Sequence, residues 1–338
     1  MGQSASDGMD DRPFTVGTAN GQSDRHPGRA VSVVRDPGDL YEVSPDAPVL
    51  DGAVMLHYLD GFIDAGAAGK LLSAHLLSML EHEEVVRFDV DRLIDYRSRR
   101  PPMIFSRDHW EAYEAPELAM YLLKDTAGSQ FLLLTGPEPD HEWENFTQAV
   151  RDVAARMGVR LAVGFHGIPM GAPHTRPLGV TAHATTSGLT TGYPPLVDRL
   201  QVPGSVAALL EMRLGEEDRA AVGFAVHVPH YLAQAAYPTA AITLLDSVSR
   251  ATGLQLPDEA LREAARETDE EIRRQVEGSE EIMEVVQALE RQYDAFAEGA
   301  ERGSLVDGSE QLPSADEIGA QFERFLAEQQ GRADSSDS

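Results

Sequence analysis

Residues 130–167, QFLLLTGPEPDHEWENFTQAVRDVAARMGVRLAVGFHG, contain an apolar run, an amphipathic stretch and a second apolar run. The middle part, 142–158, has apolar side chains at helical spacing and ends on Gly158, a residue type that favours the end of a helix. The flanking parts, 130–140 and 159–167, have the apolar character of strands buried on both faces. The stretch therefore predicts a strand, a covering helix and a second strand of a parallel sheet.

The same alternation continues on both sides of this unit. Pro101 and Pro102 interrupt it by forcing extended backbone within residues 92–106. We expect an α/β domain over residues 46–253, with a mainly parallel sheet and helices on both faces. Further strands are predicted at 47–61, 83–89, 179–186 and 220–232, and further helices at 65–82, 203–214 and 238–253.

The two ends of the chain have a different composition. Residues 1–45 are rich in Gly, Ser, Asp and Pro without periodicity, which predicts a disordered or loosely ordered arm. Residues 254–330 are predicted to form an acidic helical extension, and residues 331–338 a disordered tail. From residue 255 to the end there are 23 acidic and 8 basic residues, a net charge of −15.

Two helices are predicted within this extension. A stripe of apolar residues at intervals of three and four marks the first, and a capping box of Ser314 and Glu317 marks the start of the second. The stripe consists of Ile282, Val285, Leu289, Tyr293 and Phe296, and the second helix carries Ile318, Phe322 and Phe325.

The composition of the 338 residues excludes several classes of function. A net charge of −28 opposes binding to nucleic acid and to anionic membranes. The chain has no cysteine, so it can form neither disulfides nor thiolate zinc sites, and a reducing cytoplasm is the expected compartment. No apolar run approaches the roughly 18 residues that a membrane span needs.

The segment DAGAAGKL, residues 64–71, lies between a strand and a helix, where a phosphate-binding loop would lie. Asp64 replaces the first glycine of that motif, and Leu71 replaces the hydroxyl residue that would bind magnesium. Close packing of the helix on the sheet explains the glycines more simply. We therefore expect no nucleotide or other cofactor.

Three histidines lie within residues 164–186, GFHGIPMGAPHTRPLGVTAHATT. His166, His174 and His183 are spaced eight and nine residues apart, whereas zinc ligands on one element favour spacings near three or four. We expect no metal site, and we expect His166 and His183 to be hydrogen-bonded residues of strands. His174 differs because it lies in a short polar segment between two prolines.

The prolines in two loops predict a candidate site. Pro173 and Pro177 stiffen one loop, and Pro229 stiffens the end of a neighbouring strand. Since ligands of open α/β sheets bind at the carboxyl ends of strands, the polar residues there are expected to share a crevice. Alternatively, these groups only hydrogen-bond the loops to one another. The candidates are Asp60, Asp64, His174, Thr175, Arg176 and His230.

Four segments resemble the PAC2 (proteasome assembly chaperone) family, in particular its actinobacterial branch. They are LDGFIDAGAAGKLLSAHL, LLLTGPEPD, GFHGIPMGAPHTRPLGVTAHAT and VHVPHYLAQAAYPTAAITLLDSV, followed by the acidic EEIMEVVQALERQYDAF. The resemblance covers about residues 50–298. It implies a phosphorylase/hydrolase-like fold and homo-oligomers, trimers among them, and we expect self-association through the α/β domain because the acidic extensions would repel each other.

The resemblance leaves two kinds of function open. The first is a non-catalytic assembly, scaffolding or chaperone-like protein linked to the proteasome system. Some relatives dock through a hydrophobic-Tyr-X tail, whereas this chain ends Ser336-Asp337-Ser338. The second is a small-molecule-binding protein or a hydrolase or phosphorylase-like enzyme that uses the crevice. The ligase label of some bacterial relatives fits poorly with a chain that has only Lys70 and Lys124. An enzyme is therefore the less favoured interpretation.

Overall fold

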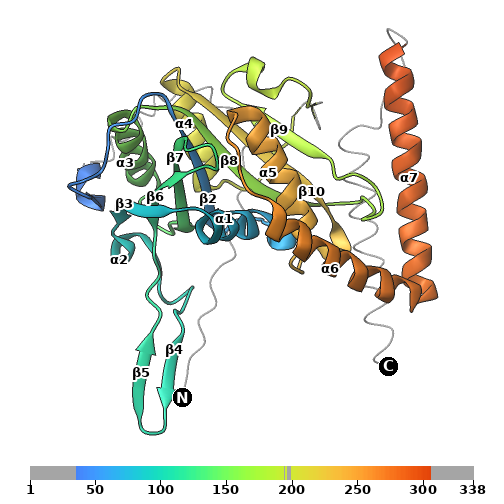
Figure 1. Ribbon diagram of the computed structural model, residues 1–338, viewed down its shortest axis with the longest axis horizontal. Helices are drawn as coiled ribbons and strands as arrows, with labels where there is room; N and C mark the ends of the chain where they lie inside the picture. The colour runs from blue at the N-terminus through green and yellow to red at the C-terminus, as the bar shows by residue number, and fades with distance from the viewer. Residues whose placement is uncertain (1–35, 194, 196–198, 306–338) are drawn as a thin grey trace, which may run out of the picture. The chain divides into compact units, whose positions relative to one another are not determined.

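The computed structural model describes residues 36–193, 195 and 199–305, with side chains described as far as residue 295. In this part of the chain, a sheet of eight strands has the order β1-β3-β6-β7-β2-β8-β10-β9 (Figure 1). The strands are β1 (Tyr41–Val43), β2 (Ala53–Asp60), β3 (His82–Phe88), β6 (Ala119–Lys124), β7 (Gln130–Pro137), β8 (Val159–Met170), β9 (Val180–Ala184) and β10 (Ala220–Pro229).

The four central strands, β7, β2, β8 and β10, are parallel. The outer strands on both sides pair antiparallel. The predicted α/β fold is thus confirmed, and the parallel pairing is confirmed for the centre of the sheet. The prediction lacks β6, which joins β7 through the short connection 125–129, and such a hairpin makes the two strands antiparallel.

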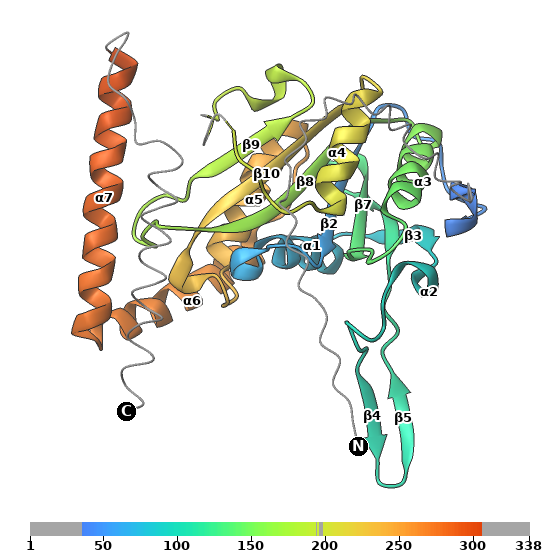
Figure 2. The ribbon, with the colours of Figure 1, turned by 180° about the vertical axis from the view of Figure 1, so that it is seen from behind.

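Helices cover both faces of the sheet, as predicted (Figures 1 and 2). On one face, α1 (Ala68–Met79) and α5 (Pro238–Thr252) pack on the even-numbered side chains of β2, such as Leu56. On the other face, α3 (Trp143–Arg156) and α4 (Val206–Glu216) pack on odd-numbered side chains such as Met55. Both side chains are fully buried, and each burial contributes roughly 1.5–3 kcal/mol.

Residues 130–167 form the predicted strand, helix and strand, as β7, α3 and β8. The two strands are not neighbours, however, because β2 lies between them and hydrogen-bonds to both. Short elements complete the fold. They are α2 (Val90–Leu93) and the 3-10 turns Pro37–Leu40, Ala65–Ala67, Ser187–Thr190 and His230–Leu232.

The N-terminal boundary of the folded part lies earlier than predicted. Residues 1–35 lie outside the described residues, but residues 36–43 form a 3-10 turn and strand β1, so the predicted arm 1–45 is too long. The reason is tertiary: β1 pairs with β3, and Leu40 is fully buried in the core.

Strands β4 (Met103–Ser106) and β5 (His109–Tyr113) form a separate two-stranded hairpin that projects away from the main sheet (Figure 1). The sequence indicated only extended backbone here, from Pro101 and Pro102. At the base of the hairpin, the Arg99 guanidinium donates to the backbone oxygens of Asp60 and Glu138, at 3.2 and 2.8 Å, and to the Asp140 carboxylate at 3.0 Å. These bonds fasten the hairpin to the carboxyl ends of β2 and β7.

The acidic extension begins with α6 (Glu259–Glu277), followed by α7 (Glu280–Leu305). Helix α6 packs against α5 and buries Leu261 and Ile272. On α7, Ile282 and Val285 of the predicted stripe are 43% and 44% exposed, while Val286 is buried. The buried side of α7 is therefore rotated by about one residue from the prediction. The Phe296 side chain, the final helix at Ser314 and the tail 331–338 lie outside the described residues.

Candidate functional site

Asp64 occupies the amino end of α1, where a phosphate loop would bind its ligand. The backbone N–H groups of Gly69, Lys70 and Gly167 donate to its carboxylate at 2.9, 3.0 and 2.9 Å. The Tyr58 hydroxyl also bonds to Asp64, and burial together with this carboxylate raises the pKa of Tyr58. A side chain of the protein thus fills the anion position that a helix amino end creates.

The glycines of this segment serve close packing, as the sequence predicted. A Cβ atom on Gly69 would lie 2.5 Å from the Tyr58 ring and 3.0 Å from the Phe165 carbonyl oxygen. Gly66 has a φ of +69°, a left-handed conformation that L side chains rarely adopt. Helix α1 can therefore approach β2 and β8 only because these positions lack side chains.

Asp60, at the end of β2, forms an ion pair with Lys70 at 3.2 Å. Both side chains are more than half exposed, at 54% and 65%. Water screens such a pair, so it contributes little to stability.

His174 and His230 both contact Tyr231. The backbone N–H of His174 donates to the Tyr231 hydroxyl oxygen at 2.9 Å, and the ring Nδ1 of His174 lies 2.7 Å from the same oxygen. The His230 ring lies edge-on to the Tyr231 ring, with 5.4 Å between centroids, and it bonds to the Met170 backbone. Burial lowers the pKa of both histidines. Tyr231 therefore joins the two loops that carry the Pro-His pairs.

Thr175 and Arg176 bind α7. The Arg176 Nε and Nη2 atoms donate to the two carboxylate oxygens of Asp294, both at 2.8 Å, and Nη1 donates to Glu290 at 3.3 Å. Thr175 donates to the same Glu290 carboxylate, and the Tyr293 hydroxyl donates to the Pro177 carbonyl oxygen at 3.1 Å. We call the contact of residues 174–177 with residues 290–294 the α7 clasp.

The six predicted crevice residues thus have two sets of partners. Asp60 and Asp64 bond to Lys70, to α1 and to Gly167. The residues of the second set bond to Tyr231, to α7 or to the Met170 backbone. These bonds are of the kind that holds loops to one another, which was the alternative left open by the sequence. A crevice shared by all six stays a prediction.

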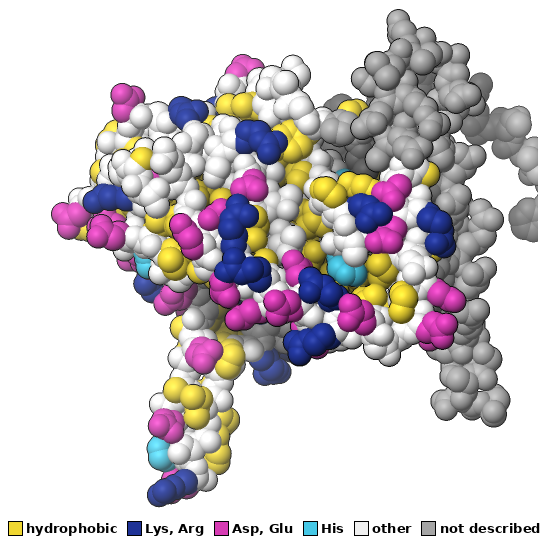
Figure 3. All heavy atoms as spheres, turned by 45° about the vertical axis from the view of Figure 1, so that its right-hand side comes forward, with side chains coloured by type: hydrophobic (Ala, Val, Ile, Leu, Met, Phe, Trp, Pro, Cys, Tyr) yellow, Lys and Arg dark blue, Asp and Glu magenta, His cyan; other side chains and the backbone are white. Residues whose placement is uncertain are grey.

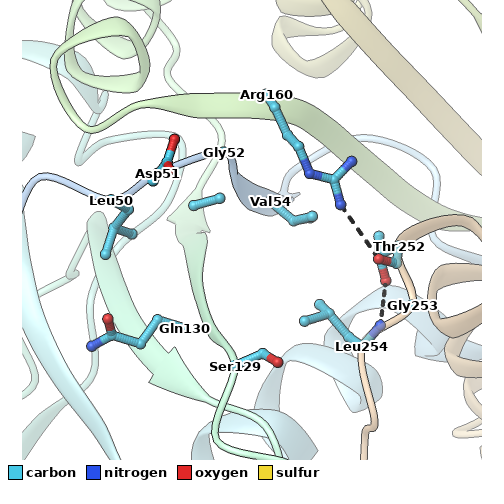
Figure 4. Close-up of a pocket in the computed structure, with 11 residues that line it drawn as sticks. Leu50, Asp51, Gly52, Val54, Ser129, Gln130, Arg160, Thr252, Gly253 and Leu254 are labelled. Carbon is cyan, nitrogen blue, oxygen red and sulfur yellow. Dashed lines mark hydrogen bonds between the residues drawn. The ribbon is translucent and has the colours of Figure 1, made fainter.

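One cavity of about 360 Å³ lies at the other end of the strands, where the central parallel strands begin (Figure 4). Figure 4 shows Arg160 reaching from β8 toward the end of α5, where its Nη2 lies 3.5 Å from the Thr252 carbonyl oxygen. The guanidinium therefore caps the carboxyl end of a helix. The other lining residues include Asp51, Gly52, Ser129 and Gln130.

A row of histidines crosses the sheet on the face that α4 covers, and the sequence analysis missed its first member. The register aligns His57 of β2, Gly164 of β8, Gly223 of β10 and His183 of β9. The His57 ring lies over Gly164, where a Cβ would come within 2.6 Å of it, and the His183 ring lies over Gly223. His166 is two residues beyond Gly164 on the same face of β8. We call His57, His166 and His183 the histidine row.

The histidine row is electrostatically unusual. His57 is 3% exposed, and its buried Nδ1 has no hydrogen-bond partner within the described part of the chain. Burial lowers the pKa of His57 and of His166 to about 4, with His183 adding to both shifts. His183 Nδ1 lies 2.9 Å from Glu211 of α4, and this hydrogen bond raises the pKa of His183.

The sequence placed His166, His174 and His183 together as three histidines of one stretch. The structure brings His57 to His166 and His183 and places His174 against Tyr231 instead. Within the described residues, no group of three histidine or acidic side chains is arranged to hold a metal ion. In the same part of the chain, no helix is long and apolar enough to cross a membrane.

Comparison with solved structures finds relatives in actinobacteria and archaea. A Mycobacterium tuberculosis protein of unknown function, Rv2714, is 48% identical, with a TM-score of 0.76 over 79% of this chain and 92% of the other. The M. tuberculosis proteasome-assembly chaperone homologue Rv2125 is 24% identical, with a TM-score of 0.64 over 69% and 99%. PbaB, a proteasome activator of the archaeon Pyrococcus furiosus, is 18% identical, with a TM-score of 0.55 over 70% and 99%.

A comparison with curated proteins found no match. The model of the PAC2 family, by contrast, matches residues 58–276. The matched region begins near the end of β2 and ends within α6, so it includes the parallel strands β7, β8 and β10, the Asp64 turn and the loop of the α7 clasp. Sequence and fold agree, and the chain belongs to the PAC2 family.

Proposed function

We propose that the protein is a non-catalytic assembly or chaperone-like protein linked to the proteasome system. The observation that carries the proposal is that the polar side chains at the strand ends are bonded within the chain. Asp64 accepts three backbone N–H groups, and Arg176 is held on two sides by carboxylates of α7. Catalysis needs such groups directed at a substrate, whereas here they stabilise loops.

The link to the proteasome rests on the family and on the names of two proteins of similar fold, the proteasome-assembly chaperone homologue and the archaeal proteasome activator. Both are less than 25% identical, so they support the fold directly and the partner only by analogy. We further propose a cytoplasmic location, which a chain without cysteine favours.

We also propose that the protein self-associates through the β4–β5 hairpin. The register pairs Met103 with Tyr113 and Phe105 with Trp110, so these four large apolar side chains share one face of the ribbon. They are 50–63% exposed. Figure 3 shows apolar side chains over much of the projecting hairpin. A lone two-stranded hairpin is marginally stable in water, so a second copy that covers this face would stabilise it.

Reconstitution of the proteasome core tests the function. Core α and β subunits from the same organism are mixed with and without the full chain, and mature particles are followed over time on native gels. We expect the chain to bind an assembly intermediate and to accelerate the appearance of mature particles. An unchanged rate together with no co-migrating chain would contradict the proposal. As a control, an unrelated acidic protein is added in place of the chain and should not change the rate at which mature particles appear.

A further inference from the structure

The histidine row lies between the sheet and α4. His57 shares its face of β2 with Met55 and Leu59, and these pack in the same core cluster as Val206 and Leu210 of α4. Figure 2 shows α4 in front of β2 and β8. The imidazole rings fit in this layer because Gly164 and Gly223 leave the space that any other side chain would fill.

Among the residues that the structure describes, no counter-charge acts on His57. His166 on β8 and His183 on β9 are the groups whose charges act on it, and both disfavour its protonation. Strand β10 contributes Gly223 and Ala225 at this level, and its His227 is bonded to Thr181 at 2.8 Å. Three carboxylates near the row or α4 bond to or act on other groups: Glu211 of α4 bonds to His183, Asp64 acts on His166, and the buried Glu138 accepts the N–H of Val206 at the start of α4 at 2.7 Å. Burial raises the pKa of Glu138.

We propose that the histidine row is an acid-responsive device that loosens α4 from the sheet when His57 and His166 become protonated. A charged ring at position 57 would be buried without an acceptor, which is strongly unfavourable. Movement of α4 relieves this, because α4 covers the ring and carries Glu211, the carboxylate already bonded to the row. Movement of the helix admits water and frees that carboxylate.

The direction of the response follows from the pKa values. Burial holds the pKa of His57 and His166 at about 4, below the ordinary value of 6.5. At these two positions the closed arrangement therefore binds fewer protons than the open one, whereas His183, whose pKa is raised by Glu211, binds its proton more tightly in the closed arrangement. The contribution of His57 and His166 to the stability of the closed arrangement is fully present above pH 6.5 and is lost as the pH falls toward 4.

Trp143 provides a local reporter for α4. Its ring lies next to Gly204, just before the helix, at 3.8 Å from the position of a Cβ there. The chain has only one other tryptophan, Trp110 on the hairpin. The full chain is prepared with Trp110→Phe, and with His141→Gln because that exposed histidine is close enough to Trp143 in sequence to quench it. Emission of Trp143 and far-UV circular dichroism are then followed from pH 8 to pH 4.

We expect Trp143 emission to change between pH 6.5 and 4 while the circular dichroism is retained. His57→Gln should move the midpoint down or remove the transition. His183→Gln should also move it down, because without the positive charge of His183, and with Glu211 free to pair with His57, the closed arrangement accepts a proton more readily. Each shift should be about half a pH unit or more. The exposed control His82→Gln should leave the midpoint unchanged.

Two results would overturn the proposal. One is an equal midpoint in the parent and in both row variants. The other is a Trp143 change that coincides with the loss of circular dichroism, because α4 would then leave only with global unfolding. If His57→Gln fails to fold, His183→Gln and an NMR titration of the histidine Cε1 protons decide the matter. A His57 signal that titrates at its ordinary pKa in the closed protein would likewise contradict it.

Discussion

Arg176 and Asp294 lie 118 residues apart in the chain and form a two-point ion pair, with Nε–Oδ1 and Nη2–Oδ2 distances of 2.8 Å. This geometry matches the planar guanidinium to both oxygens of one carboxylate. The pair joins the Pro-bounded loop after β8 to α7. Arg176 holds the pKa of Asp294 below its usual range, as expected for a carboxylate that gains a cation.

We expect Arg176→Ala to release α7 without unfolding the sheet. The substitution removes the bonds to Asp294 and Glu290 but leaves the core untouched, so amide exchange over residues 280–295 should rise several-fold. Exchange in β2 and β8 should not change. The control is Arg291→Ala, an exposed arginine of the same helix. Equal exchange in both variants would show that Arg176 does not hold the helix. If an added anion raises the melting temperature of the parent but not of Arg176→Ala, the loop binds a ligand instead.

We expect Asp64→Asn to destabilise the protein by about 1–3 kcal/mol, the usual effect of leaving a partly buried hydrogen-bonding group without its partner. The amide nitrogen would face at least one of the N–H donors of Gly69, Lys70 and Gly167. Urea unfolding measures the change. Asp60→Asn is the matched control, since its only side-chain ion pair among the described residues is the exposed one with Lys70. A loss of unfolding free energy in Asp64→Asn no greater than that in Asp60→Asn would contradict this prediction.

Gly69→Ala should cost roughly 1–3 kcal/mol through overpacking. The new methyl group would lie within 2.6 Å of two Tyr58 ring carbons, so either α1 or the ring must move. Gly171→Ala is the control because nothing lies within 4 Å of its Cβ position. In thermal unfolding, Gly69→Ala should have a clearly lower melting temperature than Gly171→Ala. If both melt as the parent does, α1 is not packed as closely as the structure indicates.

The hairpin prediction concerns association and not stability. Trp110→Glu places a charge in the proposed interface and should shift the protein toward monomer in sedimentation, while its circular dichroism is unchanged. Arg107→Glu, at the turn of the same hairpin and outside the apolar face, should leave the association unchanged. A chain ending at Gly253 should still associate if the acidic extension is dispensable. A parent that is monomeric at micromolar concentration would rule out the self-association.

Much of the α/β alternation could be predicted because apolar periodicity is a local property of the chain. Residues 130–167 show their strand, helix and strand from side-chain spacing alone. The prediction missed β6, because a short apolar segment carries a weak periodic signal. It also misplaced the buried side of α7 by about one residue, because a helix with apolar residues on two sides gives an equally weak signal. The candidate site was harder still. His174 and Arg176 were singled out through their prolines, whereas His57 lies in an apolar run that gives no sign of a polar neighbour.

The α/β class, the stiff loops and the acidic carboxyl-terminal segment can be read from the sequence, since each depends on residues close together in the chain. Contacts between distant segments were needed to show that β2 lies between β7 and β8, that His57 faces His183 across two glycines, and that Arg176 binds α7. Strand order and register arise from contacts between distant segments, which compete through packing and hydrogen bonding over the whole fold. Local patterns indicate which segments can form strands, and contacts across the folded sheet determine which strands become neighbours and in which register.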